Sequence, residues 1–268
     1  MAASIVNRLD LKQNFLKEII MRLDFQGVLQ AEMEKILLQV KPYLKEKSFN
    51  RYEEKVSNQI INNGMNVTDV SSQIVYSFMS ETSGYTMEIS NTSIVLTVSS
   101  QTYSPFSDYA DIFCHLAKIY SDTIDFFTVK RFGLRKINFC FIKNREDINK
   151  YFVPEYYCCE TPIKDYTSLA TERIERFTDG SSNINLKHAI EEGKFDKEIF
   201  YKVTLDSDIY IAEQKNIENV IFDDKSMDEI NDKLFRVYLN AITDEFLELL
   251  CSEDGMDSDK IVGVELNE

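Results

Sequence analysis

The sequence is poor in the residues that phosphate-binding loops and nucleophilic sites require. Its 268 residues include eight glycines and no Gly-x-Gly, so a glycine-rich loop that cradles phosphate is not expected. The two histidines, His115 and His188, stand without a nucleophile elbow or a reactive-cysteine context, so no nucleophilic triad can be assembled. These absences predict no cofactor and assign no catalytic residue.

Long apolar runs are also missing. No segment approaches the roughly 20 apolar residues that cross a bilayer, and Arg8 and Asp10 interrupt the place where a signal peptide has its apolar core. The cysteines are odd in number and form no Cys-x-x-Cys, at Cys114, Cys140, Cys158, Cys159 and Cys251. We therefore expect a cytoplasmic protein with reduced, packed thiols and no membrane partner.

What the chain has in excess is acid, with a formal net charge of −15. Residues 1–145 carry 17 Lys and Arg against 15 Asp and Glu, whereas the remainder carries 13 against 30, a net charge of −17. Such a segment repels phosphate backbones, which disfavours binding of nucleic acid by the whole chain. An acidic surface suits a basic protein partner.

Apolar periodicity predicts an α+β protein with two sheet-plus-helix units and mostly antiparallel or mixed sheets. The expected organisation is an N-terminal unit at 1–145, an aromatic linker at 146–162, an acidic C-terminal unit at 163–251 and an acidic tail at 252–268. In the first unit we expect helices at 29–44, ended or kinked by Pro42, and at 105–120, opened by Ser104 and Pro105. Its strands are expected at 16–25, 73–79, 85–98 (a hairpin) and 128–142. A turn is predicted at 62–64, and 45–55 is predicted as a loop or short helix.

In the second unit, strands are predicted at 172–177 and 184–190, and a hairpin is predicted to turn at Asp206 and Ser207 between 201–205 and 208–214. Ser226 and Glu229 have the spacing of a capping box, which predicts the start of a long final helix. That helix is expected to bury one apolar stripe that reaches Leu249. The tail beyond it has little to bury and is expected to be frayed.

The stretch 126–145 organises this prediction, because it holds six Lys or Arg, five Phe and no acid. Strand alternation places Arg135 on the face of Ile137, Phe139 and Phe141, and Lys136 and Asn138 on the opposite face. A guanidinium among apolar side chains requires a carboxylate or carbonyl partner. We expect a structural ion pair or a direct partner contact, and assign structural or partner-binding roles to Arg135, Asn138, Lys130, Arg131 and Lys136.

The segment Phe132-Gly133-Leu134-Arg135-Lys136-Ile137-Asn138 resembles the mid-chain signature of a sporadically distributed, largely uncharacterised bacterial protein family. In that family an arginine or similar residue precedes Gly-Leu-Arg-x-Ile-Asn. The resemblance extends along nearly the whole chain, through the strand at 16–25, through Tyr103 and Phe106, and through Ile242 and Phe246, but only residues 133–138 are specific. It implies no catalytic residues, and the patchy distribution of the family resembles that of mobile defence or toxin–antitoxin cargo.

Two chemical alternatives remain. Basic residues interleaved with Phe could bind nucleic acid, because aromatic rings stack on bases and cations hold phosphates. Asp208, Glu213 and Lys215 loosely resemble the carboxylates and lysine of metal-dependent nucleases, although their spacing is too short for the usual two-strand layout. Asp208 and Glu213 are thus candidate metal ligands.

The sequence favours a non-enzymatic protein-interaction module, with an antitoxin-like or immunity-associated accessory in a mobile defence system as its biological form. The alternative is a nucleic-acid-binding or metal-dependent nuclease-like protein.

Overall fold

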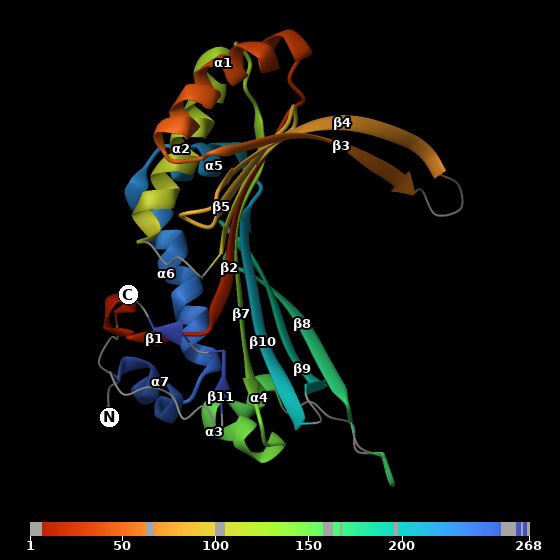
Figure 1. The fold of residues 1–268 in the computed structure, drawn as a ribbon, viewed down its shortest axis with the longest axis vertical. Coiled ribbons are helices and arrows are strands. Elements are labelled where there is room, and N and C mark those ends of the chain that lie inside the picture. Colours follow the sequence, from red (N-terminus) through yellow and green to blue (C-terminus); the bar gives the residue numbers. More distant parts are fainter. Residues whose placement is uncertain are drawn as a thin grey trace. The chain divides into compact units, whose positions relative to one another are not determined.

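The computed structural model describes residues 7–62, 67–99, 105–157, 163–166, 168–195, 198–252, 261–263 and 265–266. These residues form seven α-helices and a ten-stranded sheet (Figure 1), which confirms the α+β class. The long sheet contains β2 (Leu16–Phe25), β3 (Arg51–Asn62), β4 (Val67–Ser80), β5 (Tyr85–Ile89), β6 (Ser93–Ser99), β7 (Val129–Ile142), β8 (Ala170–Thr178), β9 (Asn183–Phe195) and β10 (Glu198–Ile211). Their order is β3-β4-β5-β6-β2-β7-β10-β9-β8, and β11 (Ile261–Val262) also pairs with β7. The successive hairpins β3–β4, β4–β5, β5–β6 and β8–β9 are antiparallel.

The chain forms two compact units that are interleaved in sequence. Unit 1 comprises residues 1–18, 135–209 and 229–268, and unit 2 comprises residues 19–134 and 210–228. Three long strands, β2 (Leu16–Phe25), β7 (Val129–Ile142) and β10 (Glu198–Ile211), give residues to both units. The units therefore do not follow the consecutive boundaries that composition predicts at 145 and 163.

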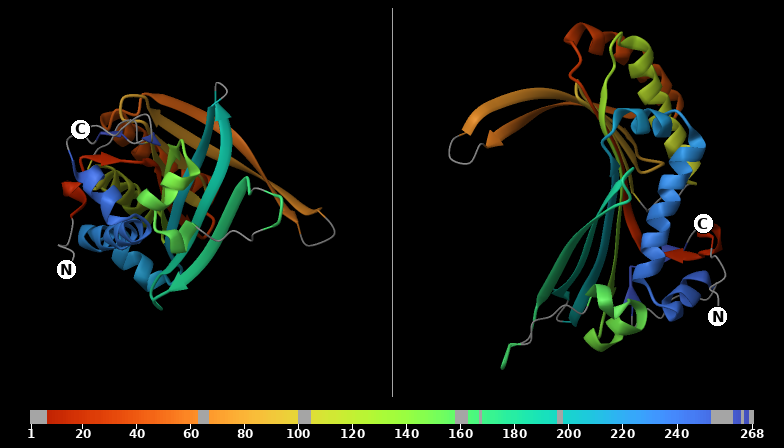
Figure 2. Two further views of the ribbon diagram at one scale, coloured as in Figure 1. Left: turned by 90° about the horizontal axis from the view of Figure 1, so that it is seen from below. Right: turned by 180° about the vertical axis from the view of Figure 1, so that it is seen from behind.

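Unit 2 packs two helices on one face of its strands. The helices α1 (Gln30–Glu46) and α2 (Phe106–Thr123) lie side by side there (Figures 1 and 2). The other elements are β3 (Arg51–Asn62), β4 (Val67–Ser80), β5 (Tyr85–Ile89), β6 (Ser93–Ser99) and α5 (Gln214–Ile221). Alternate strand residues are buried beneath the helices, as the alternation predicts: Met21, Leu23, Met87, Ile89, Ile94 and Leu96.

In unit 2 the expectation for residues 45–55 is wrong, and of the two effects expected of Pro42 the end of the helix is ruled out. The segment predicted as a loop or helix at 45–55 contains the start of β3 at Arg51, which pairs with Met79. Helix α1 continues to Glu46, four residues beyond Pro42, because the helix buries Leu44 against the unit's core. Pro105 is the residue that caps α2, and the predicted cap Ser104 and most of the predicted turn at 62–64 lie outside the described residues.

Unit 1 arranges β8 (Ala170–Thr178) and β9 (Asn183–Phe195) beside β10 and β7. Its helices are α3 (Ile148–Tyr151), α4 (Pro154–Tyr157), α7 (Asp244–Cys251) and most of α6 (Asp224–Ala241). The core is aromatic: the ring of Phe15 lies 5.4 Å from Phe246 and 5.7 Å from Phe152, centroid to centroid. The strands β1 (Gln13–Asn14) and β12 (Glu265–Leu266) pair antiparallel.

The predicted hairpin at Asp206 and Ser207 is wrong, because β10 is one continuous strand. Its alternation passes through this point unbroken, and Ser207 is buried between Leu205 and Ile209. The strand ends at Ile211, and α5 rather than a second strand follows. Aspartates at a strand centre resemble a turn in sequence, but here Asp206 is neutralised by Arg135.

Parts of the predicted linker and of the predicted tail form helices or strands that pack in unit 1. The segment predicted as an aromatic linker forms α3 and α4, which bury Tyr151, Phe152 and Tyr157 in the core of unit 1. In the tail, Ile261 is buried and pairs with Ile142 of β7, so this part is not frayed.

The caps of the last helices also differ from the prediction. Helix α6 begins at Asp224, and the Asp223 carboxylate accepts hydrogen bonds from the amide and the hydroxyl of Ser226, so Ser226 lies inside the helix. The predicted single helix is two helices, because Thr243 starts α7 and accepts from the amide of Phe246.

Candidate functional site

Arg135 forms an internal ion pair in unit 1. Its Nε donates to Asp206 Oδ1 at 2.7 Å and its Nη2 donates to Oδ2 at 2.5 Å. This fork-to-carboxylate geometry is the one that guanidinium recognises best, and it raises the pKa of Arg135. The Arg135 side chain is 44% exposed and that of Asp206 13%. The structural ion pair predicted from the strand pattern is therefore present.

The pair belongs to a series of alternating charges on neighbouring strands. Lys187 of β9 donates to Glu172 of β8 at 2.5 Å, and the nearby charge of Asp206 also raises the pKa of Lys187. The charges of Asp208 and Glu18 likewise raise the pKa of Arg135. Acids and bases follow one another from strand to strand in unit 1. Each of these charges has an opposite charge nearby, which stabilises the pairing of the strands.

Lys136 and Asn138 are directed to the other face of β7, inside unit 1. Lys136 Nζ donates to Asn231 Oδ1 at 2.5 Å, and burial lowers the pKa of Lys136 to about 7, aided by Arg8 and opposed by Asp232. Asn138 is buried and donates from Nδ2 to the Leu205 carbonyl at 3.2 Å. Both residues hold β7 to its neighbours in the same unit.

Lys130 and Arg131 belong to unit 2. Lys130 is exposed. The Arg131 guanidinium lies 4.9 Å from the centroid of the Tyr210 ring and 3.9 Å from the Asp24 carboxylate. Arg131 thus has internal partners as well.

The candidate nuclease residues do not share one strand. Asp208 lies in β10, where its carboxylate accepts from Asn185 Nδ2 at 3.2 Å. Glu213 lies at the N-cap of α5 and accepts from Asn216, and Lys215 lies in the first turn of that helix. Within the described part of the chain, no three His, Cys, Asp or Glu side chains are grouped so that they could hold a metal ion.

A surface that the sequence reasoning missed lies at the end of β7 and the start of β10. Phe139 and Phe141 are half-buried, with ring centroids 5.7 Å apart. The Nζ atoms of Lys202 and Lys17 lie 4.5 Å and 5.8 Å from the Phe139 centroid, within cation–π range. We call Phe139, Phe141, Phe200, Lys17, Lys143 and Lys202 the aromatic–lysine patch.

A pocket of about 460 Å³ adjoins this patch. Its lining combines aromatic and aliphatic carbon with charges of both signs, from Phe141, Glu191, Glu192, Gly193, Lys194, Phe200, Lys202 and Val262. The volume lies in the range of small-molecule sites. The signal in the sequence was the alternation that placed Phe139 and Phe141 with Arg135 rather than with the core residues Leu134 and Cys140.

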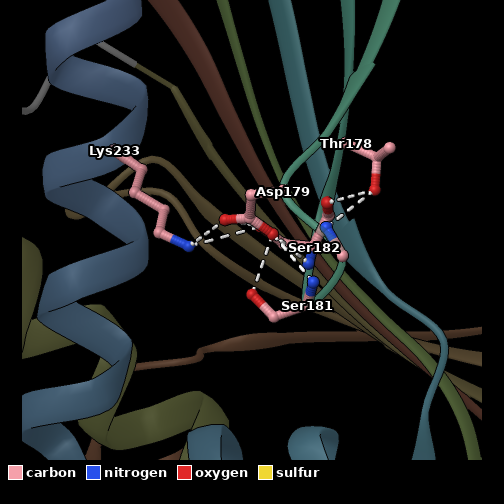
Figure 3. Close-up of polar contacts among 6 residues, drawn as sticks. Thr178, Asp179, Ser181, Ser182 and Lys233 are labelled. Carbon is pink, nitrogen blue, oxygen red and sulfur yellow. Dashed lines mark hydrogen bonds and ion pairs between the residues drawn. The ribbon is translucent and has the colours of Figure 1, made fainter.

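The turn between β8 and β9 is a second polar cluster (Figure 3). Asp179 accepts hydrogen bonds from the amides and hydroxyls of Ser181 and Ser182, and Lys233 of α6 donates to it at 2.8 Å. The lysine and these donors hold the pKa of Asp179 well below its ordinary range. The cluster fixes one end of β8 to α6 within unit 1.

His188 is a packing residue. It lies 4.8 Å and 5.4 Å from the Tyr156 and Tyr157 rings, centroid to centroid, and burial lowers its pKa to about 4. The imidazole is therefore neutral at physiological pH.

Comparison with known proteins does not place the chain in a family. No family model and no curated protein matches it. One similar solved structure is the crystal structure of the di-domain ARO/CYC StfQ from the steffimycin biosynthetic pathway, at 8% identity and a TM-score of 0.17, over 87% of this chain and 96% of that chain. So low a TM-score carries no functional argument. Among the described residues, no helix has the length and apolar character of a membrane span.

Proposed function

We propose that the chain is a non-enzymatic protein-interaction module whose acidic surface binds a basic protein partner. The observation that carries this proposal is the internal use of three basic residues, two in β7 and one just beyond its end. Arg135 is bonded to Asp206, Lys136 to Asn231, and Lys143 lies 3.7 Å from Glu198. Much of the positive charge is thus occupied inside the chain, and the excess acid is left to meet other molecules.

The net charge of the compact units supports the same proposal. Unit 1 has 18 Lys and Arg against 27 Asp and Glu, a net charge of −9, and unit 2 has 12 against 18, a net charge of −6. The contrast between a neutral and an acidic half of the sequence is replaced by two acidic units. Both attract basic proteins and repel nucleic-acid backbones.

Acidic residues, of which all but Asp147 are exposed, gather in one part of unit 1. Helices α3 and α7 are joined by hydrogen bonds from the Thr243 amide to the Tyr151 carbonyl at 3.0 Å and from the Thr243 hydroxyl to the Lys150 carbonyl at 2.6 Å. We call the acids on and beside these helices the α3–α7 acidic patch: Glu146, Asp147, Asp244, Glu245 and Glu248. Lys150 lies 3.7 Å from Glu245 and offsets the charge of that residue. The patch is the preferred place for a basic partner.

An antitoxin-like or immunity-associated accessory is the biological form of the proposal, as the resemblance at residues 133–138 implies. A basic partner suits an acidic accessory because complementary charge steers association.

The test is affinity purification of the tagged chain from its native host. We expect one stoichiometric protein of high isoelectric point, and we expect it to be released when salt is raised from about 0.1 M to about 0.5 M, because screening shortens the range of surface charge. The double variant Glu245→Lys/Glu248→Lys should reduce its recovery about tenfold.

The matched control is Glu34→Lys, which changes an exposed acid of α1 in unit 2. It should leave recovery unchanged. Absence of a stoichiometric partner, or equal loss with the control variant, would contradict the proposal.

The aromatic–lysine patch favours a second candidate function, binding of single-stranded nucleic acid without cleavage. Rings that lie at the surface under lysine ammonium groups can stack on bases while the cations contact phosphates. The acids of the adjoining pocket oppose this function.

Fluorescence anisotropy with short single-stranded DNA and RNA separates the two candidates. If the patch binds nucleic acid, Phe139→Ala and Lys202→Ala should each weaken binding about tenfold. Phe126→Ala, which removes a ring that is 90% exposed in unit 2, should have no effect. No binding at about 0.05 M salt would exclude this second function.

A further inference from the structure

Strand β8 is an edge strand of the sheet. Its nine residues pair with β9 in an unbroken register, and no described strand pairs with its other side. Figures 1 and 2 show it as the outermost strand of unit 1. An edge of this kind presents backbone N–H and C=O groups to any chain that can pair with it, and β8 has neither the proline nor the bulge that commonly prevents pairing.

The surroundings of β8 are apolar for a surface. Of the fourteen large apolar side chains that are exposed among the described residues, five fall between residues 163 and 177: Ile163, Tyr166, Leu169, Ile174 and Phe177. Ile174 is 60% exposed at the middle of the strand. Such a concentration marks an interaction surface rather than ordinary scatter.

The charges of β8 determine which partner fits. The strand reads Ala170-Thr171-Glu172-Arg173-Ile174-Glu175-Arg176-Phe177-Thr178. In an antiparallel pair of two such strands centred on Ile174, Glu172 lies opposite Arg176 and Arg173 lies opposite Glu175. By two-fold symmetry each contact occurs twice, so four opposite-charge pairs flank a central Ile174 pair.

The same charged residues make neighbouring symmetric registers unfavourable, because like charges would lie opposite each other. Centring the pair on Arg173 or on Glu175 places that charge against its own copy. Centring it on Glu172 or Arg176 does the same. The sequence of the strand therefore favours one register of self-pairing and opposes its neighbours, as specific interfaces require.

The existing contacts are compatible with this arrangement. Arg173 is already 2.6 Å from Glu175 on its own strand, and Glu172 is 2.5 Å from Lys187. Cross-strand pairs would extend these contacts into a network. The anchored turn at Asp179 fixes one end of β8, which lowers the entropy lost on pairing.

We propose that two copies of the chain associate through β8, in an antiparallel two-fold pair centred on Ile174 that continues the sheet of unit 1 from one copy into the other. The partner is a second copy because the charge pattern of the strand is complementary to itself. This dimer does not depend on the basic partner proposed above.

Sedimentation analysis of the full chain across a concentration series tests the dimer. We expect a reversible monomer–dimer equilibrium with a dissociation constant below about 100 μM. Arg176→Glu places an acid opposite Glu172 and should raise that constant at least about tenfold. The triple variant Glu172→Lys/Arg176→Glu/Lys187→Gln exchanges the two charges without setting two lysines side by side within one copy, and it should restore most of the affinity.

Arg236→Glu is the matched control, since Arg236 is an exposed arginine of α6 and not of β8. It should leave the equilibrium unchanged. Circular dichroism confirms that each variant is folded, and the triple variant keeps the test decisive if Arg176→Glu is destabilised. A strictly monomeric wild-type chain, or a dimer that Arg176→Glu leaves intact, would overturn the proposal.

Cysteine crosslinking tests the register. Ile174→Cys should form a disulfide with its own copy under mild oxidation, because the two Cβ atoms would lie about 5 Å apart. Thr178→Cys should not, since its copies would be eight residues apart along the paired strands, or about 27 Å at roughly 3.4 Å per residue. Peptide mapping identifies the linked cysteines, and crosslinking at 178 but not 174 would overturn the register.

Discussion

At the scale of single residues, Lys136 makes the clearest pH-dependent contribution. Burial lowers its pKa from 10.5 to about 7, so between these values the unfolded chain binds a proton that the folded chain does not. Stability must therefore rise with pH in this window, and the cost of the buried charge is fully present below pH 7.

We expect Lys136→Met to abolish this dependence. Relative to the variant, the wild type should gain on the order of 2–4 kcal/mol in the free energy of unfolding between pH 7 and pH 10. Urea unfolding at a series of pH values measures this change in the free energy of unfolding. Lys130→Met, at an exposed position of the same strand, should keep the wild-type slope, and an unchanged slope in Lys136→Met would contradict the expectation.

The Arg135–Asp206 pair should contribute modestly, because the arginine side chain is 44% exposed. In a double-mutant cycle with Arg135→Met and Asp206→Asn, we expect a coupling free energy of about 0.5–1 kcal/mol that decreases in high salt. Arg135→Lys should retain only part of it, because an ammonium cannot donate as a fork. Coupling indistinguishable from zero at low salt would remove the structural role assigned to the pair.

At the scale of elements, the break between α6 and α7 depends on Thr243. Its hydroxyl accepts from the amide of Phe246 at 3.2 Å and donates to the Lys150 carbonyl at 2.6 Å. Thr243→Ala should lower the free energy of unfolding by about 1 kcal/mol. Thr243→Ser should restore most of it, and chemical denaturation distinguishes the two variants.

The turn at Asp179 should be sensitive to acid. Because its pKa is held below the ordinary value near 3.8, Asp179 stabilises the folded state above about pH 4, and this contribution is lost as the pH falls further. Asp179→Asn should therefore be less stable than the wild type at pH 7 and should lose less stability on acidification. Denaturation at pH 3–7 measures this, with Asp165→Asn, an exposed acid of unit 1, as the control.

Elements that arise from interactions between residues close in sequence could be predicted, and elements that depend on distant residues could not. The alternation of β2 and of the β5–β6 hairpin and the stripes of α1 and α2 are visible in sequence because neighbouring residues produce them. The continuity of β10 was not visible, because the residue that neutralises Asp206 is Arg135, 71 positions earlier. The aromatic–lysine patch was missed for the same reason, since Phe139 acquires its lysine from β10.

At the scale of the whole molecule, the interleaved units imply that sequential fragments cannot fold. A fragment of residues 1–145 would lack α5 from unit 2 and most of unit 1. A fragment of residues 163–251 would lack β7 and Phe15, whose ring contacts Phe246.

We expect both fragments to give poorly dispersed amide proton spectra and no cooperative thermal transition. The full chain should give a well-dispersed spectrum and one cooperative transition. A folded, cooperative 1–145 fragment would contradict this expectation. A permuted chain that keeps all strands is the control, because it preserves every pairing partner.

The pairing of β11 with β7 and the contact of Phe246 with Phe15 join residues that are far apart in the sequence. They therefore form late during synthesis on the ribosome. At about 5–20 residues per second, β7 would emerge roughly 5–20 s before Phe246 does. During that interval its buried face, with Cys140 and Ile142, has no partner from the last helices. The newly made chain therefore presents an apolar strand to chaperones until α7 has emerged, and slow codons between β7 and α7 would lengthen that exposure.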